Sequence, residues 1–140
     1  MTTTTEENKE LIRELTEAWN ARDRERMAAT YADQIRVHGT DETRSRAEML
    51  DAEWGFFDAF PDVEATTEHL IAEDDLVVVR WSVVGTHEGE LRGIEPTGRE
   101  VEYEEWAMYR VKDGEITEMW AQTDALGVFE QLDAVDPPSG

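Results

Sequence analysis

The stretch LVVVRWSVVGT, residues 76–86, decides the fold. Valines dominate it and apolar side chains fall on both of its faces, so the pattern predicts a long strand covered on both sides. Arg80 is the one charged residue in this stretch. Because a buried guanidinium needs a partner, we expect Arg80 to pair with a glutamate; the alternative is that it binds a substrate carboxylate.

Neighbouring segments supply the rest of a sheet. Apolar and polar residues alternate over residues 63–73, 99–112 and 115–123, which predicts three further strands. Asp113-Gly114 is a strong signal for a hairpin turn between the last two. Residues 34–39 predict a short strand that precedes the others, and the polar residues after it, 40–44, predict a loop.

Helices are expected mainly in the first half of the chain. Apolar residues at helical spacing predict helices over residues 5–21, 23–32 and 45–60, and Asp124 is placed to cap a short closing helix. Helices that come first and strands that come last indicate the α+β class. We therefore expect a cone-shaped, curved antiparallel sheet, with three N-terminal helices enclosing a pocket and a short C-terminal helix.

The length of 140 residues is that of one domain. We assign residues 6–133 to this domain, with a frayed N-terminus at 1–5 and a flexible tail at 134–140. No apolar run approaches the roughly 20 residues that span a bilayer, and the first residues do not resemble a signal peptide. The sequence therefore predicts a cytoplasmic protein.

Acidic residues outnumber basic ones by 34 to 13, which gives a formal net charge of −21. Phosphate backbones and anionic lipids would repel such a chain, so neither nucleic acid nor a membrane is expected as a partner. The acidic, lysine-poor composition favours adaptation to salt over an ordinary acidic protein, and we expect low salt to destabilise the fold. There is no cysteine, and the three histidines lack metal-binding spacing, so we expect no metal and no cofactor.

Several motifs resemble those of the SnoaL-like polyketide cyclase family, within the nuclear-transport-factor-like α+β cone superfamily. They are Ala59-Phe-Pro-Asp62, Asp75–Trp81, Gly85-Thr-His-Glu-Gly89, Gly93–Gly98 and Tyr109–Ile116. The resemblance implies a small cone with a hydrophobic cavity and a homodimer formed through the open sheet face. It also implies an intramolecular aldol ring closure that needs neither metal nor cofactor.

The last strand departs from the family pattern. Family members commonly read Glu-His-Trp-Asp there, with the Asp as acid/base, whereas this chain reads Glu118-Met119-Trp120-Ala121. The Glu and the Trp are kept, while Met119 and Ala121 stand at the His and Asp positions. This departure favours a binding protein over an enzyme.

Three residues are candidates for acid/base catalysis. Glu118 lies mid-strand beside Trp120, and a carboxyl group in an apolar cavity has a raised pKa and can remove an α-proton. The alternative for Glu118 is the outer sheet face, or a partnership with Arg80 or Arg110. Asp124 is the second candidate, with helix capping as its alternative. His38 is the third, with an exposed strand end as its alternative.

Aromatic side chains at helical and strand spacing are candidates for the cavity wall, although such residues are more often plain core. The predicted substrate-binding residues are Trp19, Tyr31, Trp54, Phe57, Arg80, Trp106 and Met119. The acidic run Glu102, Glu104 and Glu105 predicts a solvated face or the sheet surface of a dimer.

The sequence leaves three functions open. The first is a cofactor-free cyclase, isomerase or lyase acting on a small apolar substrate. The second is a non-catalytic protein that binds a small hydrophobic ligand, and the third is a dimerising module whose pocket is vestigial. Glu118 and His38 favour the first, and Met119 and Ala121 favour the second.

Overall fold

The computed structural model describes residues 4–39 and 42–133. The helices are α1 (Thr5–Ala21), α2 (Arg24–Ala28), α3 (Arg46–Ala59) and α4 (Ala125–Gln131). The strands are β1 (Tyr31–Val37), β2 (Glu42–Ser45), β3 (Glu64–Glu73), β4 (Leu76–Thr86), β5 (Glu100–Lys112) and β6 (Glu115–Thr123). We expected a frayed N-terminus at 1–5 and a flexible tail at 134–140. Of these, residues 1–3 and 134–140 lie outside the described residues.

Local capping explains where the long helices begin. Thr4 accepts a hydrogen bond from the backbone of Glu7, and the Glu7 side chain accepts one in return, which completes a capping box at the start of α1. Ser45 and Glu48 form the same box at the start of α3. The bounds predicted from the sequence for these two helices, 5–21 and 45–60, are confirmed to within a residue or two.

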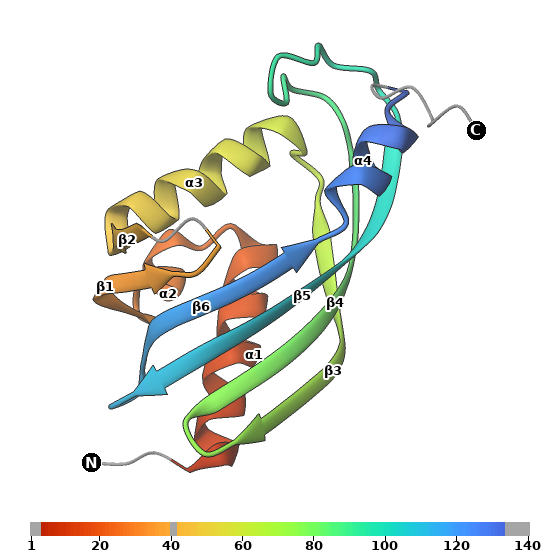
Figure 1. The fold of residues 1–140 in the computed structure, drawn as a ribbon. Coiled ribbons are helices and arrows are strands. Elements are labelled where there is room, and N and C mark those ends of the chain that lie inside the picture. The colour runs from red at the N-terminus through yellow and green to blue at the C-terminus, as the bar shows by residue number, and fades with distance from the viewer. Residues whose placement is uncertain (1–3, 40–41, 134–140) are drawn as a thin grey trace.

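The six strands form one open sheet in the order β2-β1-β6-β5-β4-β3. All neighbouring pairs are antiparallel except β1 and β6, which run parallel, so the sheet is mixed. The expected polar loop over residues 40–44 contains a short strand, β2, which pairs with β1. Figure 1 shows the long strands β3 to β6 curving past α1, with α3 above and α4 at the far end. The α+β cone is confirmed.

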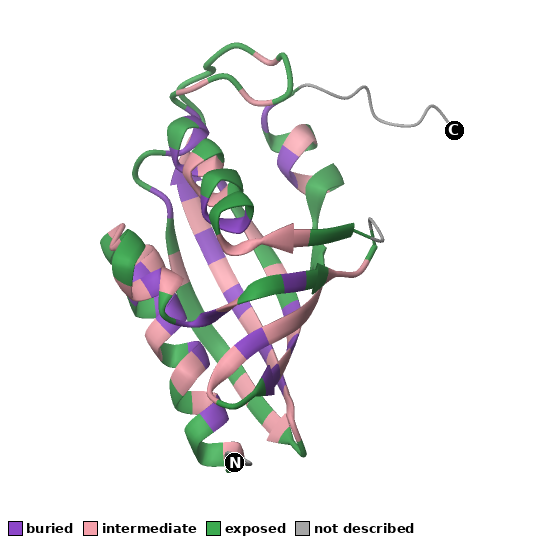
Figure 2. Cartoon of the chain, turned by 90° about the vertical axis from the view of Figure 1, so that its left-hand side faces the viewer, coloured by how far each residue is buried: buried purple, intermediate pink, exposed green. Residues whose placement is uncertain are grey.

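The two faces of the sheet have different neighbours. Side chains at alternate positions of β4, among them Trp81 and Val83, are buried under the helices on the concave face. Arg80 and the other alternate positions are only half-buried, because no helix of the described chain covers the convex face. The expectation that β4 is buried on both sides is therefore wrong for the single chain. Figure 2 shows this alternation of buried and less buried residues along the strands.

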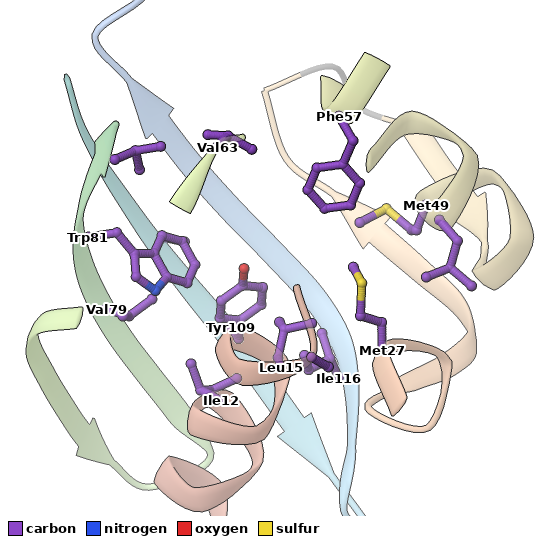
Figure 3. Close-up of a cluster of buried hydrophobic side chains, with 14 of the residues drawn as sticks. Ile12, Leu15, Met27, Met49, Phe57, Val63, Val79, Trp81, Tyr109 and Ile116 are labelled. Atoms are coloured by element: carbon purple, nitrogen blue, oxygen red, sulfur yellow. The ribbon is translucent and has the colours of Figure 1, made fainter. Parts of the chain in front are cut away.

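The core lies between the concave face and the helices. Ile12 and Leu15 of α1 pack against strand residues such as Val79 and Ile116, and each is at most 4% exposed. Met27 of α2 and Met49 of α3 fill the other end of the same cluster (Figure 3). These apolar side chains fill part of the space between the helices and the sheet. A cavity occupies another part of that space.

Candidate functional site

A cavity of about 340 Å³ opens between the concave face and the helices. Its walls come from α1, α3, α4, the concave sides of β4 and β5, and the loop between those strands. Most of the lining is apolar or aromatic, which is the usual character of a small-molecule site. The aromatic lining residues are Trp19, Tyr31, Phe56, Phe60, Trp81, Tyr103, Tyr109 and Phe129.

Glu53 projects from α3 into this wall. It lies four residues after Met49 and four before Phe57, within the apolar stripe that faces the sheet. Trp19 Nε1 donates a hydrogen bond to Glu53 Oε2 at 2.6 Å. Burial raises the pKa of Glu53 to about 7 from its ordinary value of 4.5, although the Trp19 hydrogen bond lowers it and nearby Glu105 adds to the rise.

Glu105 reaches the same cavity from β5. Its neighbours on the concave side of the strand are Tyr103 and Ala107, so this acid occupies an inward-facing position. Thr123 Oγ1 donates to Glu105 Oε1 at 2.6 Å. Burial raises the pKa of Glu105 as well. Neither Glu53 nor Glu105 has an ion-pair partner among residues 4–39 and 42–133.

Three tyrosines stand around the two carboxyl groups. Tyr31, Tyr103 and Tyr109 all line the cavity, and burial raises the pKa of each phenol. Figure 3 shows the Tyr109 hydroxyl directed toward the space between Trp81 and Phe57. Within the described part of the chain, no hydrogen bond occupies these hydroxyls, so they remain available as donors to a bound molecule.

The loop between β4 and β5 forms one rim of the cavity, through Leu91 and Arg92. At the base of this loop, Gly89 N–H donates to the carbonyl of Ala59 at 3.1 Å. A side chain is impossible at Gly89, since a Cβ there would lie 2.0 Å from the carbonyl oxygen of Asp58. This contact fixes the loop against the end of α3 (Figure 1). Leu91 and Arg92 of the loop thereby stay at the rim of the cavity.

His87, at the start of the same loop, is a structural residue. It is fully buried, and its Nδ1 accepts a hydrogen bond from the backbone N–H of Thr97 at 3.2 Å. Its ring packs 5.6 Å from that of Phe60. The histidine therefore holds the two ends of the loop together.

The predicted binding residues are divided between the cavity and other places. Trp19 and Tyr31 line the cavity. Trp54 and Phe57, both on α3, pack edge to face with their ring centres 5.1 Å apart. Met119 packs against the core without reaching the cavity. Arg80 and Trp106 lie together on the convex face, where the guanidinium stands 5.9 Å from the indole ring.

Arg80 is paired with Glu104, which confirms the expected partnership with a glutamate. His69 Nδ1 lies 3.3 Å from the same guanidinium. Arg80 thus belongs to a polar group on the convex face, separated from the cavity by the sheet.

Glu118 and His38 also meet on the convex face, 2.7 Å apart. Arg110 Nε donates to Glu118 at 3.0 Å, and the same guanidinium binds Asp75 at 2.8 Å. The His38 ring stacks on Trp120 at 4.2 Å. We call His38, Asp75, Arg110, Glu118 and Trp120 the convex-face network. The hydrogen bond with His38 and the charge of Arg110 lower the pKa of Glu118.

Asp124 caps α4, as its alternative interpretation stated: its Oδ1 accepts from the Gly127 N–H at 2.9 Å. None of the predicted catalytic residues, Glu118, Asp124 and His38, lines the cavity. Their catalytic role stays a prediction, and the cavity presents Glu53 and Glu105 in their place.

Sequence reasoning missed both cavity acids, although each carries a signal. Glu53 interrupts an apolar helix stripe, and Glu105 interrupts the apolar alternation of Val101, Tyr103 and Ala107. Treating Glu102, Glu104 and Glu105 as one charge run hid the fact that neighbouring strand residues face opposite ways.

Over residues 4–39 and 42–133, no three side chains of the metal-binding types lie close enough together to hold an ion. No helix in that part of the chain is both long and apolar enough to cross a membrane.

Fold and cavity together define an α+β cone protein with an interior aromatic cavity. The family model for SnoaL-like polyketide cyclases matches residues 9–132, so the chain belongs to that family. A comparison with curated protein sequences finds no significant match.

Solved structures of the same fold are numerous. AclR from Streptomyces galilaeus, described as a "putative hydroxylase", has a TM-score of 0.86 and 29% identity over 96% of this chain and 89% of its own. IdmH from Streptomyces antibioticus, a "putative polyketide cyclase", has a TM-score of 0.80 and 32% identity over 90% of this chain and 98% of its own. A SnoaL-like protein from Jannaschia has a TM-score of 0.85 at 24% identity, covering 98% of both chains.

The register of the last strand explains the departure from the family pattern. Ala121 lies opposite Ala107, and Met119 lies opposite the cavity residue Tyr109, so both are on the concave face. The family's Asp position is thus on the cavity side of the sheet, and here it holds a methyl group. An acid on this side must come from another element.

Proposed function

We propose that the protein is a cofactor-independent acid/base enzyme that moves a proton on a small apolar carbonyl compound, in a ring closure, an isomerisation or a related lyase step. One observation carries the proposal: two half-buried carboxyl groups without cationic partners among the described residues, Glu53 and Glu105, open into an aromatic cavity. The names of IdmH and AclR support chemistry on a small molecule.

The chemistry follows from the two carboxyl groups. With a pKa of about 7, Glu53 is ionised in a large fraction of molecules near neutral pH and can remove an α-proton. The C–H electron pair moves toward the carbonyl oxygen, which takes on negative charge. A tyrosine hydroxyl such as that of Tyr109 is a donor that stabilises this enolate oxygen.

A ring closure needs one further step. The enolate carbon attacks a second carbonyl group of the same molecule, and the alkoxide that forms takes a proton from a carboxylic acid. Glu53, protonated in the first step, supplies it and returns to its starting state. The proton is conserved, and the sequence of steps requires no oxidant and no reductant.

Hydrogen–deuterium exchange of a probe ketone tests this proposal. β-Tetralone is apolar, bicyclic and enolisable, and its α-protons can be followed by proton NMR in deuterium oxide. We expect the wild type to accelerate the exchange, and Glu53→Gln to lose at least about a hundredfold of that acceleration. Glu105→Gln should lose a smaller factor, because Glu53 remains as the base.

Glu118→Gln is the matched control, since it removes a carboxylate from the convex face of the same sheet. It should leave the exchange rate within about threefold of wild type. A rate that falls in Glu118→Gln but not in Glu53→Gln would overturn the assignment and restore Glu118 as the candidate.

A second function is supported by Ala121 and Met119, which stand on the cavity side where family members carry polar residues. In this alternative, the cavity binds a small hydrophobic ligand without changing it. Binding of β-tetralone with no acceleration of exchange, in wild type and Glu53→Gln alike, would favour the binding protein.

We also propose that two copies associate through the convex face. Two large apolar side chains on this face, Trp106 and Ile71, are 47% and 62% exposed. A second copy would cover them and the half-buried side of β4. Sedimentation of the wild type as a dimer and of Trp106→Glu as a folded monomer is the expected result, and a wild-type monomer at all concentrations would contradict it.

A further inference from the structure

Arg92 occupies a tight turn at the mouth of the cavity. The backbones of Leu91 and Ile94 donate to each other at 3.0 and 2.8 Å, which closes a two-residue turn over Arg92 and Gly93. Both turn residues are left-handed, with φ of 47° and 84°. Glycine adopts this conformation freely, whereas a long side chain such as arginine is disfavoured in it.

Another turn of this chain shows the ordinary solution. Asp113-Gly114 connects β5 and β6 with φ of 51° and 77°, nearly the same conformation, and places an aspartate at the first position. Asn, Asp and Gly are the residues that such turns favour. Arg92 is therefore not explained by the turn itself.

Arg22 shows how a left-handed arginine is otherwise compensated. It ends α1 with φ of 58°, and its guanidinium donates to the carbonyls of Pro61 and Val63 at 2.9 and 2.8 Å. It also lies 4.0 Å from the centre of the Phe57 ring. The side chain thus joins α1 to the segment that leads into β3.

Arg92 has no such partner. Within residues 4–39 and 42–133, no carboxylate or carbonyl accepts a hydrogen bond from it, and its one contact of note is the Phe129 ring at 6.0 Å. The side chain lines the cavity, where it is the only basic residue of the lining. A guanidinium without an anionic partner among the described residues is notable, because acidic residues outnumber basic ones by 34 to 13 in this chain.

We propose that Arg92 binds the carboxylate of an aromatic acid, whose ring system lies in the cavity while its acid group stays at the mouth. A guanidinium presents paired N–H donors that match the two oxygens of a carboxylate. The two cavity acids disfavour a negative group at depth, so the charged end belongs at the rim. A singly charged carboxylate neutralises the positive charge of Arg92. A doubly charged phosphate would leave one uncompensated negative charge in a molecule that is already acidic.

This inference rests on the cavity of the proposed function and adds the substrate class. It concerns binding alone, so it is tested without any turnover. The probes are β-naphthoate and β-naphthamide, which share shape and ring system and differ in charge. Titration calorimetry with about 0.2 M KCl, where long-range charge effects are largely screened, gives both dissociation constants.

We expect Arg92→Asn to weaken naphthoate binding at least about tenfold and to change naphthamide binding less than about threefold. Asparagine suits the left-handed turn, so the melting temperature of Arg92→Asn should equal or exceed that of wild type. A loss of ligand selectivity together with an undiminished melting temperature is a result that a structural role for Arg92 does not produce.

Arg24→Asn is the matched control. Arg24 is also exposed and lies over an aromatic ring, that of Trp54 at 5.1 Å, but it is not part of the cavity. It removes the same charge and should leave both dissociation constants within about twofold, since distant charges are screened.

The contrary outcomes are distinct. Equal losses for acid and amide in Arg92→Asn, or an equal loss of naphthoate binding in Arg24→Asn, would overturn the role of Arg92 and leave the proposed acid/base function standing. Binding of the amide but not the acid by wild type would also overturn it. Failure of wild type to bind either probe would count against the cavity itself, and so against both proposals.

Discussion

The two faces of one sheet treat the same kind of side chain in opposite ways. On the concave side, Glu53 of α3 and Glu105 of β5 are half-buried in the wall of an aromatic cavity, and the loss of hydration there raises the pKa of both. On the convex face, Glu118 is paired with His38 and Arg110, which lower its pKa. The convex carboxylate is stabilised as an anion by its partners, whereas each concave one is held where ionisation is unfavourable.

The difference distinguishes a carboxylate that stabilises the fold from carboxyl groups that are able to react. A carboxylate that is satisfied by cations gains little from a ligand and serves the fold. A carboxyl group that gains no cation from the fold is poised to exchange a proton with whatever enters the cavity. The comparison therefore predicts that substitutions on the two faces have opposite signs for stability.

The largest effect is expected for Glu53→Gln at alkaline pH. A pKa raised from 4.5 to about 7 corresponds to roughly 3 kcal/mol of instability once the group is ionised. The folded state binds the proton more tightly than the unfolded state, so wild-type stability falls as the pH rises from about 4.5 to 7. Denaturation at a series of pH values should show Glu53→Gln gaining about 3 kcal/mol over wild type at pH 8, and nothing near pH 4.

Glu105 offers a test of the same idea in a second position. Glu105→Gln should also stabilise the protein at high pH, since burial raises that pKa too. A loss of stability at pH 8 in both variants would mean that these carboxylates are paired in solution, and the contrast between the faces would be lost.

A smaller effect is expected when the Trp19 hydrogen bond is removed. Trp19→Phe keeps an aromatic ring but takes away the N–H that favours ionised Glu53. The pKa of Glu53 should then rise further, and carbon NMR of the carboxyl group can follow that rise. Trp54→Phe is the control: both indoles pack against Phe57, at 4.9 and 5.1 Å between ring centres, but the hydrogen bond to Glu53 comes from Trp19. Equal shifts in the two variants would assign the effect to packing.

Features encoded over a few residues were predictable from the sequence. The capping boxes at Thr4 and Ser45 and the bounds of β4 and β6 follow from local patterns, and the structure agrees with them. The parallel pairing of β1 with β6 was not predictable in this way, because it joins strands about eighty residues apart in the chain.

The site was harder to predict for the same reason. That Glu118 and Trp120 share one face is a local property of a strand, and it holds. Which of the two faces the helices cover depends on how distant elements pack, and the sequence of β6 does not state it. Family resemblance located the cavity but pointed to the family's Asp position, which is Ala121 here.

The smallest effect is expected for Glu118→Gln, on the convex face. Because the folded pKa of Glu118 is lowered, its ion pairs contribute stability at neutral pH that is lost as the pH falls through that pKa. The side chain is 26% exposed, so the loss at pH 7 should be less than about 1 kcal/mol and should shrink further in molar KCl. Arg110→Gln combined with Glu118→Gln completes a double-mutant cycle that isolates the pair. A gain in stability at pH 7 in Glu118→Gln would show that this carboxylate is as unfavourably placed as Glu53, and the distinction between a stabilising convex face and a reactive concave one would fail.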